Sequence, residues 1–230
     1  MLKENLDNVL ENINKACEKA GRKPEDVTLI AVSKTKPLSD IEELITYGIK
    51  EYGENKVQEL CDKYEAVSTK VNWHLIGHLQ TNKVKYIVDK AYLIHSVDSI
   101  HLAQEIEKQA AKKDVACDIL IQVNIAHEET KFGIDETNIY EILDTVKDFE
   151  HIRVRGLMTI APFVDNPEDN RGYFRKMHQL LLDIKSKNID NVDMSILSMG
   201  MTNDYMVAIE EGATMVRVGT GIFGERNYNI

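Results

Sequence analysis

Two lysines, one residue apart, follow an apolar run near the N-terminus. The segment TLIAVSKTKP at 28–37 passes from small and branched apolar residues to Lys34 and Lys36 and then to a proline. Because side chains alternate along a strand, the two lysines are expected on one face together with Val32. Desolvation and a neighbouring cation both favour the neutral form of a lysine, and a neutral amine forms a Schiff base with an aldehyde. The alternative is that both side chains leave the end of a strand and extend into water.

Two glycine-containing segments near the C-terminus have the composition of phosphate-binding turns. LSMGMTND at 197–204 and VRVGTGIFG at 216–224 each place glycine and hydroxyl residues after an apolar run. Backbone amides and hydroxyls at the start of a helix bind phosphate, and α/β barrels often use the loops after strands seven and eight. Each segment alone is also compatible with an ordinary turn from strand to helix. Together with a lysine that reacts with an aldehyde, they indicate pyridoxal 5'-phosphate (PLP) as the ligand.

Arg217 is the third candidate for contact with PLP. It alternates with Val216 and Val218, so its side chain points either into a barrel interior or onto the surrounding helices. In the interior it would face the pyridine nitrogen, where PLP enzymes place either Asp or Arg. An arginine does not give its proton to the ring, so the ring would remain a poor electron sink. A structural ion pair is the alternative role.

The spacing of the apolar segments predicts eight strands separated by helices, after an amphipathic helix from Asn5 to Ala20. The strands are expected at 28–34, 50–54, 73–77, 93–97, 118–125, 154–160, 194–200 and 215–220. The helices between them are expected at 39–47, 55–67, 81–89, 99–113, 136–147, 169–187 and 203–211. Continuous apolar runs are typical of parallel strands covered on both faces. The pattern favours a single (β/α)8 TIM barrel over residues 1–230, with an open doubly wound sheet as the alternative.

Composition and residue spacing argue against several kinds of binding partner and against a metal site. A formal net charge of -10 argues against binding to nucleic acid or to an anionic membrane. The three cysteines lack a CxxC spacing, and neither a secretory signal nor an apolar run of about 18 residues is visible, so we expect a cytoplasmic protein. His74 and His78 have an HxxxH spacing, but the residues between them are predicted as strand rather than helix, so no metal site is expected.

Five segments of the chain together resemble the pyridoxal phosphate homeostasis proteins. They are AVSKTKP, YGENKVQE, WHLIGHLQTNK, GLMTIAP and the stretch 197–224. The resemblance runs through almost the whole chain and implies a PLP-binding barrel similar to the N-terminal domain of alanine racemase. Two positions depart from the usual motifs: Tyr52 replaces phenylalanine, and Thr202 replaces serine but keeps the hydroxyl.

The resemblance also assigns roles to individual residues. It implies that Lys34 carries PLP as a Schiff base and that Lys36 takes part in cofactor exchange. Asn55 falls in the motif that approaches the ring, and Arg217 matches the partner of the ring nitrogen. The phosphate side is implied to consist of Ser198, Gly200, Met201, Thr202, Gly219 and Thr220. Lys131, in the loop after the fifth strand, matches a lysine of the family and is implied as an accessory contact, with an ordinary exposed loop lysine as the alternative.

Two functional classes fit a PLP-binding barrel: an amino-acid racemase or related enzyme, and a protein that holds, buffers or delivers PLP. Racemisation needs a second base besides the lysine, and alanine-racemase-like enzymes take this base, a tyrosine, from an additional β-domain. The sequence reaches Ile230 soon after its eighth predicted strand, and nothing argues for Tyr205 or Tyr228 in that role. We therefore predict PLP homeostasis with weak or absent catalysis, PLP-dependent apoenzymes as recipients, and a monomer.

Overall fold

Eight parallel strands close into a barrel in chain order, with β8 hydrogen-bonded back to β1. The computed structural model describes residues 1–225. The strands are β1 (Thr28–Val32), β2 (Glu51–Glu54), β3 (Asn72–Leu75), β4 (Leu93–Val97), β5 (Cys117–Gln122), β6 (Ile152–Met158), β7 (Val192–Met201) and β8 (Met215–Val218). The predicted barrel is confirmed, and closure excludes the open sheet.

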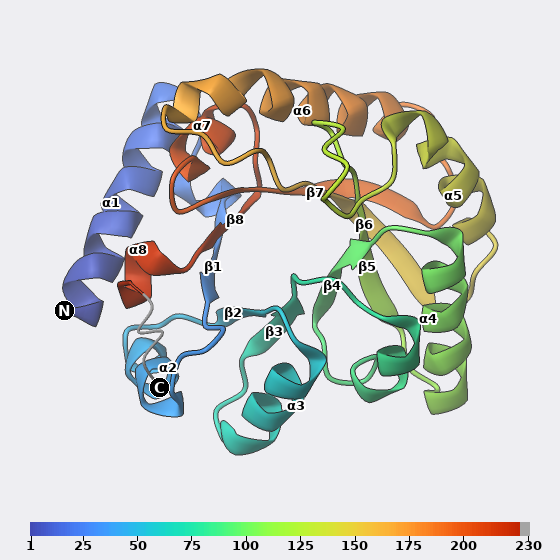
Figure 1. Cartoon of the computed structure of the whole chain (residues 1–230), viewed down its shortest axis with the longest axis horizontal. Helices are drawn as coiled ribbons and strands as arrows, with labels where there is room; N and C mark the ends of the chain where they lie inside the picture. Colours follow the sequence, from blue (N-terminus) through green and yellow to red (C-terminus); the bar gives the residue numbers. More distant parts are fainter. Residues whose placement is uncertain (226–230) are drawn as a thin grey trace.

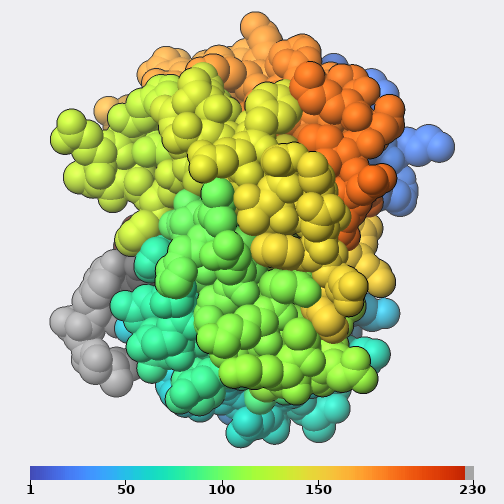
Figure 2. Space-filling model, turned by 90° about the vertical axis from the view of Figure 1, so that its right-hand side faces the viewer, coloured from blue at the N-terminus to red at the C-terminus, as the bar shows by residue number. Residues whose placement is uncertain are grey.

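Helices surround the strands, and the predicted N-terminal helix precedes the barrel (Figure 1). The α-helices are α1 (Leu2–Lys19), α2 (Leu38–Thr46), α3 (Val57–Ala66), α4 (Ile100–Lys113), α5 (Ile139–Val146), α6 (Arg171–Lys185), α7 (Tyr205–Glu210) and α8 (Thr220–Phe223). The connections contain the 3-10 helices η1 (Pro24–Asp26), η2 (Thr81–Tyr86), η3 (Glu136–Asn138) and η4 (Pro167–Asn170). Figure 2 shows the side of the molecule that α4 and α5 cover. Within the described residues, no helix has both the length and the apolar composition to cross a membrane.

Apolar side chains are buried on both faces of the barrel wall. The larger core lies between the strands and the helices. A second cluster comes from five different strands, which places it inside the barrel: Ile30, Leu93, Leu120, Met158 and Met215. Each such side chain contributes about 1.5–3 kcal/mol when fully buried. Burial on two faces explains why the strand segments are continuous apolar runs.

The helix α1 packs against α8, the helix that includes part of the second glycine-rich turn. Leu6, Val9 and Ile13 lie three to four residues apart, so they form one buried stripe. This helix packs against α7 and α8. The Asn5 side-chain amide also donates a hydrogen bond to the Ile222 carbonyl of α8 (2.9 Å). The position of α8 is therefore fixed from outside the barrel.

Several element boundaries differ from the sequence-based expectation, and three of these differences lie in or near the segments of interest. The first strand ends at Val32, because Thr35 has a left-handed backbone (φ 63°) that turns the chain away from the sheet. Within the segment expected as a helix at 81–89, Thr81–Tyr86 form the 3-10 helix η2, in which amides bond carbonyls three residues back, instead of an α-helix. The last strand ends at Val218, and α8 begins two residues later.

Candidate functional site

Lys34 and Lys36 lie in the turn that leaves β1 at the carboxyl end of the barrel. Lys34 is half-buried. The Thr35 amide between them donates to Glu59 Oε1 on α3 (2.5 Å), and the Lys36 amide donates to the Ser33 carbonyl (3.0 Å). Both lysines are therefore outside the strand. The strand alternation that predicted a common face does not apply to them, and the turn sets their positions instead.

Lys36 points toward the end of α8. Its Nζ donates to the carbonyls of Phe223 (3.1 Å) and Gly224 (3.5 Å), and it lies 5.9 Å from the centroid of the Phe223 ring. These carbonyls belong to the last turn of a helix, where they have no partner within the helix. Lys36 consequently links the β1 turn to the second glycine-rich turn.

A buried ion pair supports the β1 turn from below. Lys63 Nζ on α3 donates to Glu54 Oε1 (2.8 Å), to Glu59 Oε1 (2.8 Å) and to the Ser33 carbonyl (2.7 Å). The Ser33 hydroxyl also donates to Glu54 (2.6 Å). Burial raises the pKa of Glu54, although Lys63 and Ser33 oppose the shift. Sequence reasoning misses this cluster, and its only signal is a glutamate inside the strand predicted at 50–54.

Arg217 is turned into the barrel interior and is 3% exposed. Its Nη1 donates to the Ser198 hydroxyl oxygen (2.5 Å), and its Nη2 donates to the Thr159 carbonyl (2.8 Å). Burial lowers the pKa of Arg217 to about 10, against the influence of Asp204. The guanidinium is thus held by a hydroxyl and a carbonyl rather than by an ion pair. Ser198, implied on the phosphate side, lies fully buried beside Arg217.

A series of buried polar side chains crosses the barrel interior to reach Arg217. His95 Nδ1 lies 2.9 Å from Ser198 Oγ, and His95 Nε2 lies 2.9 Å from His74 Nδ1. His74 Nε2 in turn lies 2.7 Å from Oε2 of Glu51, the first residue of β2. Burial, with smaller effects of His74 and Arg217, keeps the pKa of His95 well below its usual value. We call this series, from Glu51 to Arg217, the interior chain. Sequence reasoning misses it, although a histidine inside each of two predicted strands could have indicated buried polar contacts.

The two glycine-rich turns lie against each other. Thr202 Oγ1, after β7, accepts hydrogen bonds from the amides of Gly219 (3.3 Å) and Gly221 (3.4 Å), after β8. The first turn is closed by Asp204, whose Oδ1 accepts from the Met201 amide (2.8 Å). The structure therefore brings together the residues implied on the phosphate side, apart from Ser198.

Gly200 is required by the shape of the first turn. Its φ is 93°, and an added Cβ would lie 2.6 Å from Ala208 Cβ and 2.9 Å from Tyr205 Cα. The turn can pass so close to α7 only without a side chain at this position. Thr220, the first residue of α8, is exposed beside the turn.

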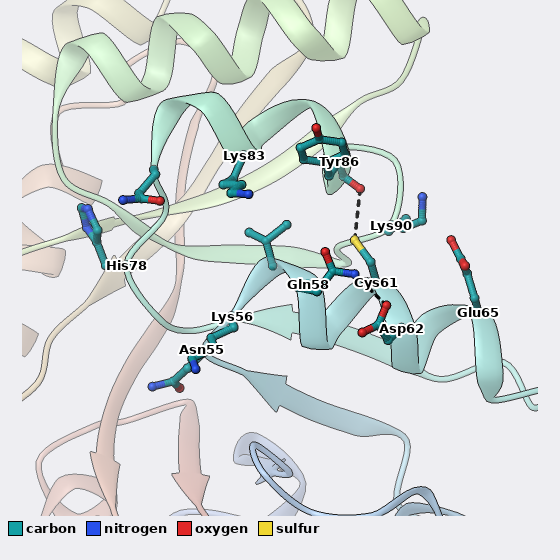
Figure 3. A pocket seen from close by; sticks show the side chains of 12 residues that line it. Asn55, Lys56, Gln58, Cys61, Asp62, Glu65, His78, Lys83, Tyr86 and Lys90 are labelled. Carbon is teal, nitrogen blue, oxygen red and sulfur yellow. Dashed lines mark hydrogen bonds between the residues drawn. The ribbon is translucent and has the colours of Figure 1, made fainter.

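Asn55 follows β2, and its backbone passes close to Gly77, where an added Cβ would lie 2.3 Å from the Asn55 carbonyl oxygen. A cavity of about 640 Å³ lies beside Asn55, between α3 and η2 (Figure 3). Its lining carries charges of both signs, from Lys56, Asp62, Glu65, Lys83 and Lys90. Of the residues predicted to contact PLP, only Asn55 lines this cavity; the β1-turn lysines and Arg217 do not.

The loop after β5 is fastened on two sides. Lys131 Nζ donates to the Ala161 carbonyl (3.0 Å) and pairs with Glu128. The Phe132 ring stacks on His78, with centroids 3.8 Å apart and ring planes at 11°. Lys131 thus has one partner in its own loop and one after β6. His78 stacks on this loop, whereas His74 lies in the barrel interior. Among residues 1–225, no group of His, Cys, Asp and Glu side chains could hold a metal ion.

Comparison with known proteins places this geometry in a family. Residues 5–227 match the family model described as alanine racemase, N-terminal domain. The chain is 50% identical to a pyridoxal phosphate homeostasis protein of Aquifex aeolicus, with 98% of each chain covered. It is 37% identical to a protein of the same name from Pseudomonas aeruginosa, with 98% of this chain and 96% of that protein covered. The chain belongs to the pyridoxal phosphate homeostasis protein family.

Solved structures agree with the family and the fold. One of them is PipY of Synechococcus elongatus, whose structure is described with PLP bound. It matches this chain with a TM-score of 0.85 and 30% sequence identity, and the match covers 97% of this chain and 100% of PipY. An alanine racemase of Clostridium difficile matches with a TM-score of 0.74 over 99% of this chain and 60% of the racemase chain. Its sequence identity is 15%, so this likeness shows the fold alone. The predicted family and the likeness to the alanine racemase N-terminal domain are confirmed.

In this homeostasis-family barrel, the ends of β1, β7 and β8 bring most of the predicted residues to one place. β8 pairs with β1, and Arg217 stands opposite Ile30, four residues before Lys34. The two glycine-rich turns follow the same neighbouring strands. Asn55 and Lys131 lie on other loops, after β2 and β5.

Proposed function

We propose that this protein binds PLP at the carboxyl ends of β1, β7 and β8 and serves intracellular PLP homeostasis by holding, buffering or delivering the cofactor. The observation that carries the proposal is the buried Arg217, fixed by two hydrogen bonds on the strand beside the Lys34 turn. The PLP described in PipY and the names of the curated relatives support it. In this proposal residues 1–230 form one PLP-binding domain.

The donor groups present fit a phosphorylated pyridine aldehyde. The Thr202 hydroxyl oxygen accepts from the amides of Gly219 and Gly221 where the two turns meet, so its own proton remains as a donor for a phosphate. PLP, when bound, supplies an aldehyde to which amines add reversibly. Lys34, half-buried on the adjacent turn, is the proposed site of Schiff-base attachment.

Arg217 suits storage of PLP better than catalysis. Even with a pKa lowered to about 10, its guanidinium keeps its proton at neutral pH and only donates hydrogen bonds. A pyridine nitrogen that faces it remains unprotonated, so the ring withdraws electrons weakly. The residue therefore binds the ring without promoting carbanion chemistry.

Lys36 is proposed as the second amine in cofactor exchange. It lies two residues from Lys34, but its Nζ is hydrogen-bonded to the end of α8, 3.1 Å from the Phe223 carbonyl. These bonds must break before the amine can react. Exchange through Lys36 would therefore be coupled to movement at the end of α8. Lys131, held at Ala161, is at most an accessory contact in this proposal.

Within the described residues, Tyr205 is poorly placed to serve as the second base that the racemase alternative needs. Tyr205 is 6% exposed, burial raises the pKa of its phenol, and its hydroxyl is engaged by Asn12 on α1. Tyr228 lies outside the described residues. We therefore propose a cytoplasmic, monomeric carrier with PLP-dependent apoenzymes as recipients and with weak or absent catalysis. Robust turnover of an amino acid by contaminant-free protein would contradict this.

Borohydride reduction of the PLP-loaded protein, followed by peptide mapping, tests the proposal. The expected result is a phosphopyridoxyl group on Lys34. Lys34→Ala is expected to lose the label and the visible absorbance of bound PLP while keeping its far-UV circular dichroism, and Lys36→Ala serves as the matched variant that retains both. A label scattered over surface lysines, or an unchanged spectrum in Lys34→Ala, would reject the site.

A further inference from the structure

The proposed function does not use one feature of the interior chain, namely the direction in which its hydrogen bonds are donated. Arg217 at one end only donates hydrogen bonds, and an ionised Glu51 at the other end only accepts them. Hydrogen bonds from His74 and Asn72 outweigh the effect of burial and lower the pKa of Glu51, which keeps it ionised near neutral pH. When both histidine rings are neutral, the acceptor Glu51 fixes which atom donates in every link between the two ends.

The direction determines the tautomers of both histidines. Ser198 Oγ accepts from Arg217, and with Nδ1 of the neutral His95 unprotonated, the serine proton goes to that nitrogen (2.9 Å). His95 then donates from Nε2 to His74 Nδ1 (2.9 Å), and His74 donates from Nε2 to Glu51 (2.7 Å). This arrangement places the proton of each ring on Nε2 and gives every ring nitrogen a hydrogen-bond partner.

The same assignment changes the role of Ser198. Its single proton is donated to His95, and its oxygen accepts from Arg217, so the hydroxyl has no donor left for a phosphate. The side chain is fully buried, whereas Met201 and Thr220 of the two turns are exposed. Ser198 thus belongs with Arg217 and not with the phosphate turns.

We infer that the interior chain positions Arg217 for the PLP ring, with Ser198 and His95 as positioning residues that hold the guanidinium between β7 and the Thr159 carbonyl. This inference deepens the proposed function and rests on it only in the contact between Arg217 and the ring. Without the neutral His95 to accept the Ser198 proton, the serine hydroxyl is free to rotate, and one of the two hydrogen bonds that fix Arg217 is weakened.

Added protons would disturb this arrangement. The charged and titratable groups that face the histidines are Arg217 from β8, Glu51 from β2 and Tyr92, whose ring lies 5.5 Å from that of His74. A proton on His95 would place a second buried cation one hydroxyl away from Arg217 and reverse the hydrogen bond to Ser198. The orientation of Arg217 therefore depends on a neutral His95.

The first test needs no PLP. Nitrogen-15 NMR of the histidine rings in the protein without added PLP is expected to show His74 and His95 neutral at pH 7, each protonated on Nε2. Ser198→Ala is expected to shift the His95 Nδ1 resonance and to leave exposed His78 unchanged. An imidazolium, or a proton on Nδ1 of either ring, would overturn the inference whether or not the protein binds PLP.

The second test uses PLP-loaded His95→Leu and His95→Gln. Leucine removes both hydrogen bonds, whereas the glutamine amide retains one acceptor and one donor and does not titrate. We expect His95→Leu to keep the borohydride label on Lys34, to bind PLP about tenfold more weakly and to shift the absorbance of the bound ring, as the loss of one charge-assisted bond implies. His95→Gln is expected to restore both. Wild-type affinity and spectrum in a folded, labelled His95→Leu would overturn the inference, while a missing label on wild-type Lys34 would instead reject the proposed function.

Discussion

At the scale of single residues, Arg217 separates binding of PLP from catalysis with it. Arg217→Glu replaces a buried cation with a carboxylate that faces the Thr159 carbonyl, 2.8 Å from the present guanidinium. We expect loss of about 3–5 kcal/mol of stability, since one buried charged group is left without its partners. We also expect faster loss of PLP on dialysis and a more protonated ring, both read from the visible spectrum.

Arg217→Lys is the matched variant, because it keeps the charge and loses the fork that reaches Ser198 and Thr159 together. Its expected stability lies between wild type and Arg217→Glu in urea unfolding. If Arg217→Glu retained PLP with a wild-type spectrum, the ring nitrogen would have to lie elsewhere.

At the scale of elements, the first glycine-rich turn makes a prediction that separates strain from contact. Gly200→Ala adds a Cβ at φ 93° that would collide with Ala208 and Tyr205 of α7, whereas Gly21→Ala adds one at φ 64° with nothing within 4 Å. Backbone strain costs about 1–3 kcal/mol at either site, and overpacking adds about 1–3 kcal/mol at Gly200 alone. Urea unfolding should therefore rank Gly200→Ala below Gly21→Ala, and PLP affinity should fall only in Gly200→Ala. If the two variants lost the same amount of stability and the same PLP affinity, the turn would not depend on its contact with α7.

The strands and loops also show which parts of the fold and of the candidate site are predictable from the sequence. All eight strands are predicted, and most of them are continuous apolar runs because parallel strands in a barrel bury both faces. The end of β1 is not, since the left-handed Thr35 leaves no mark in composition and depends on Glu59 of α3 to hold its amide. Residue types and spacing single out the two lysines and the glycine-rich turns, and the resemblance then selects Lys34 as the proposed Schiff-base lysine. The interior chain escapes prediction because its links join β2, β3, β4, β7 and β8, which lie far apart in the sequence.

At the scale of the whole molecule, the barrel carries its polar groups inside and must keep them neutral or paired. His95 is completely buried, and burial keeps its pKa in the folded state well below the usual value of 6.5. In the unfolded chain the same ring takes up a proton near pH 6.5. Below that pH the unfolded state therefore binds more protons than the folded state, and folding stability falls as the pH falls.

This linkage gives a global prediction about acid stability. The free energy of unfolding is expected to decrease below about pH 6.5 with a slope that includes up to about 1.4 kcal/mol per pH unit from His95. His95→Gln removes that contribution, so the difference between its unfolding free energy and that of wild type should change between pH 7 and pH 5. Parallel pH profiles for wild type and His95→Gln would mean that His95 is protonated in the folded barrel, and the neutral interior chain would then be wrong.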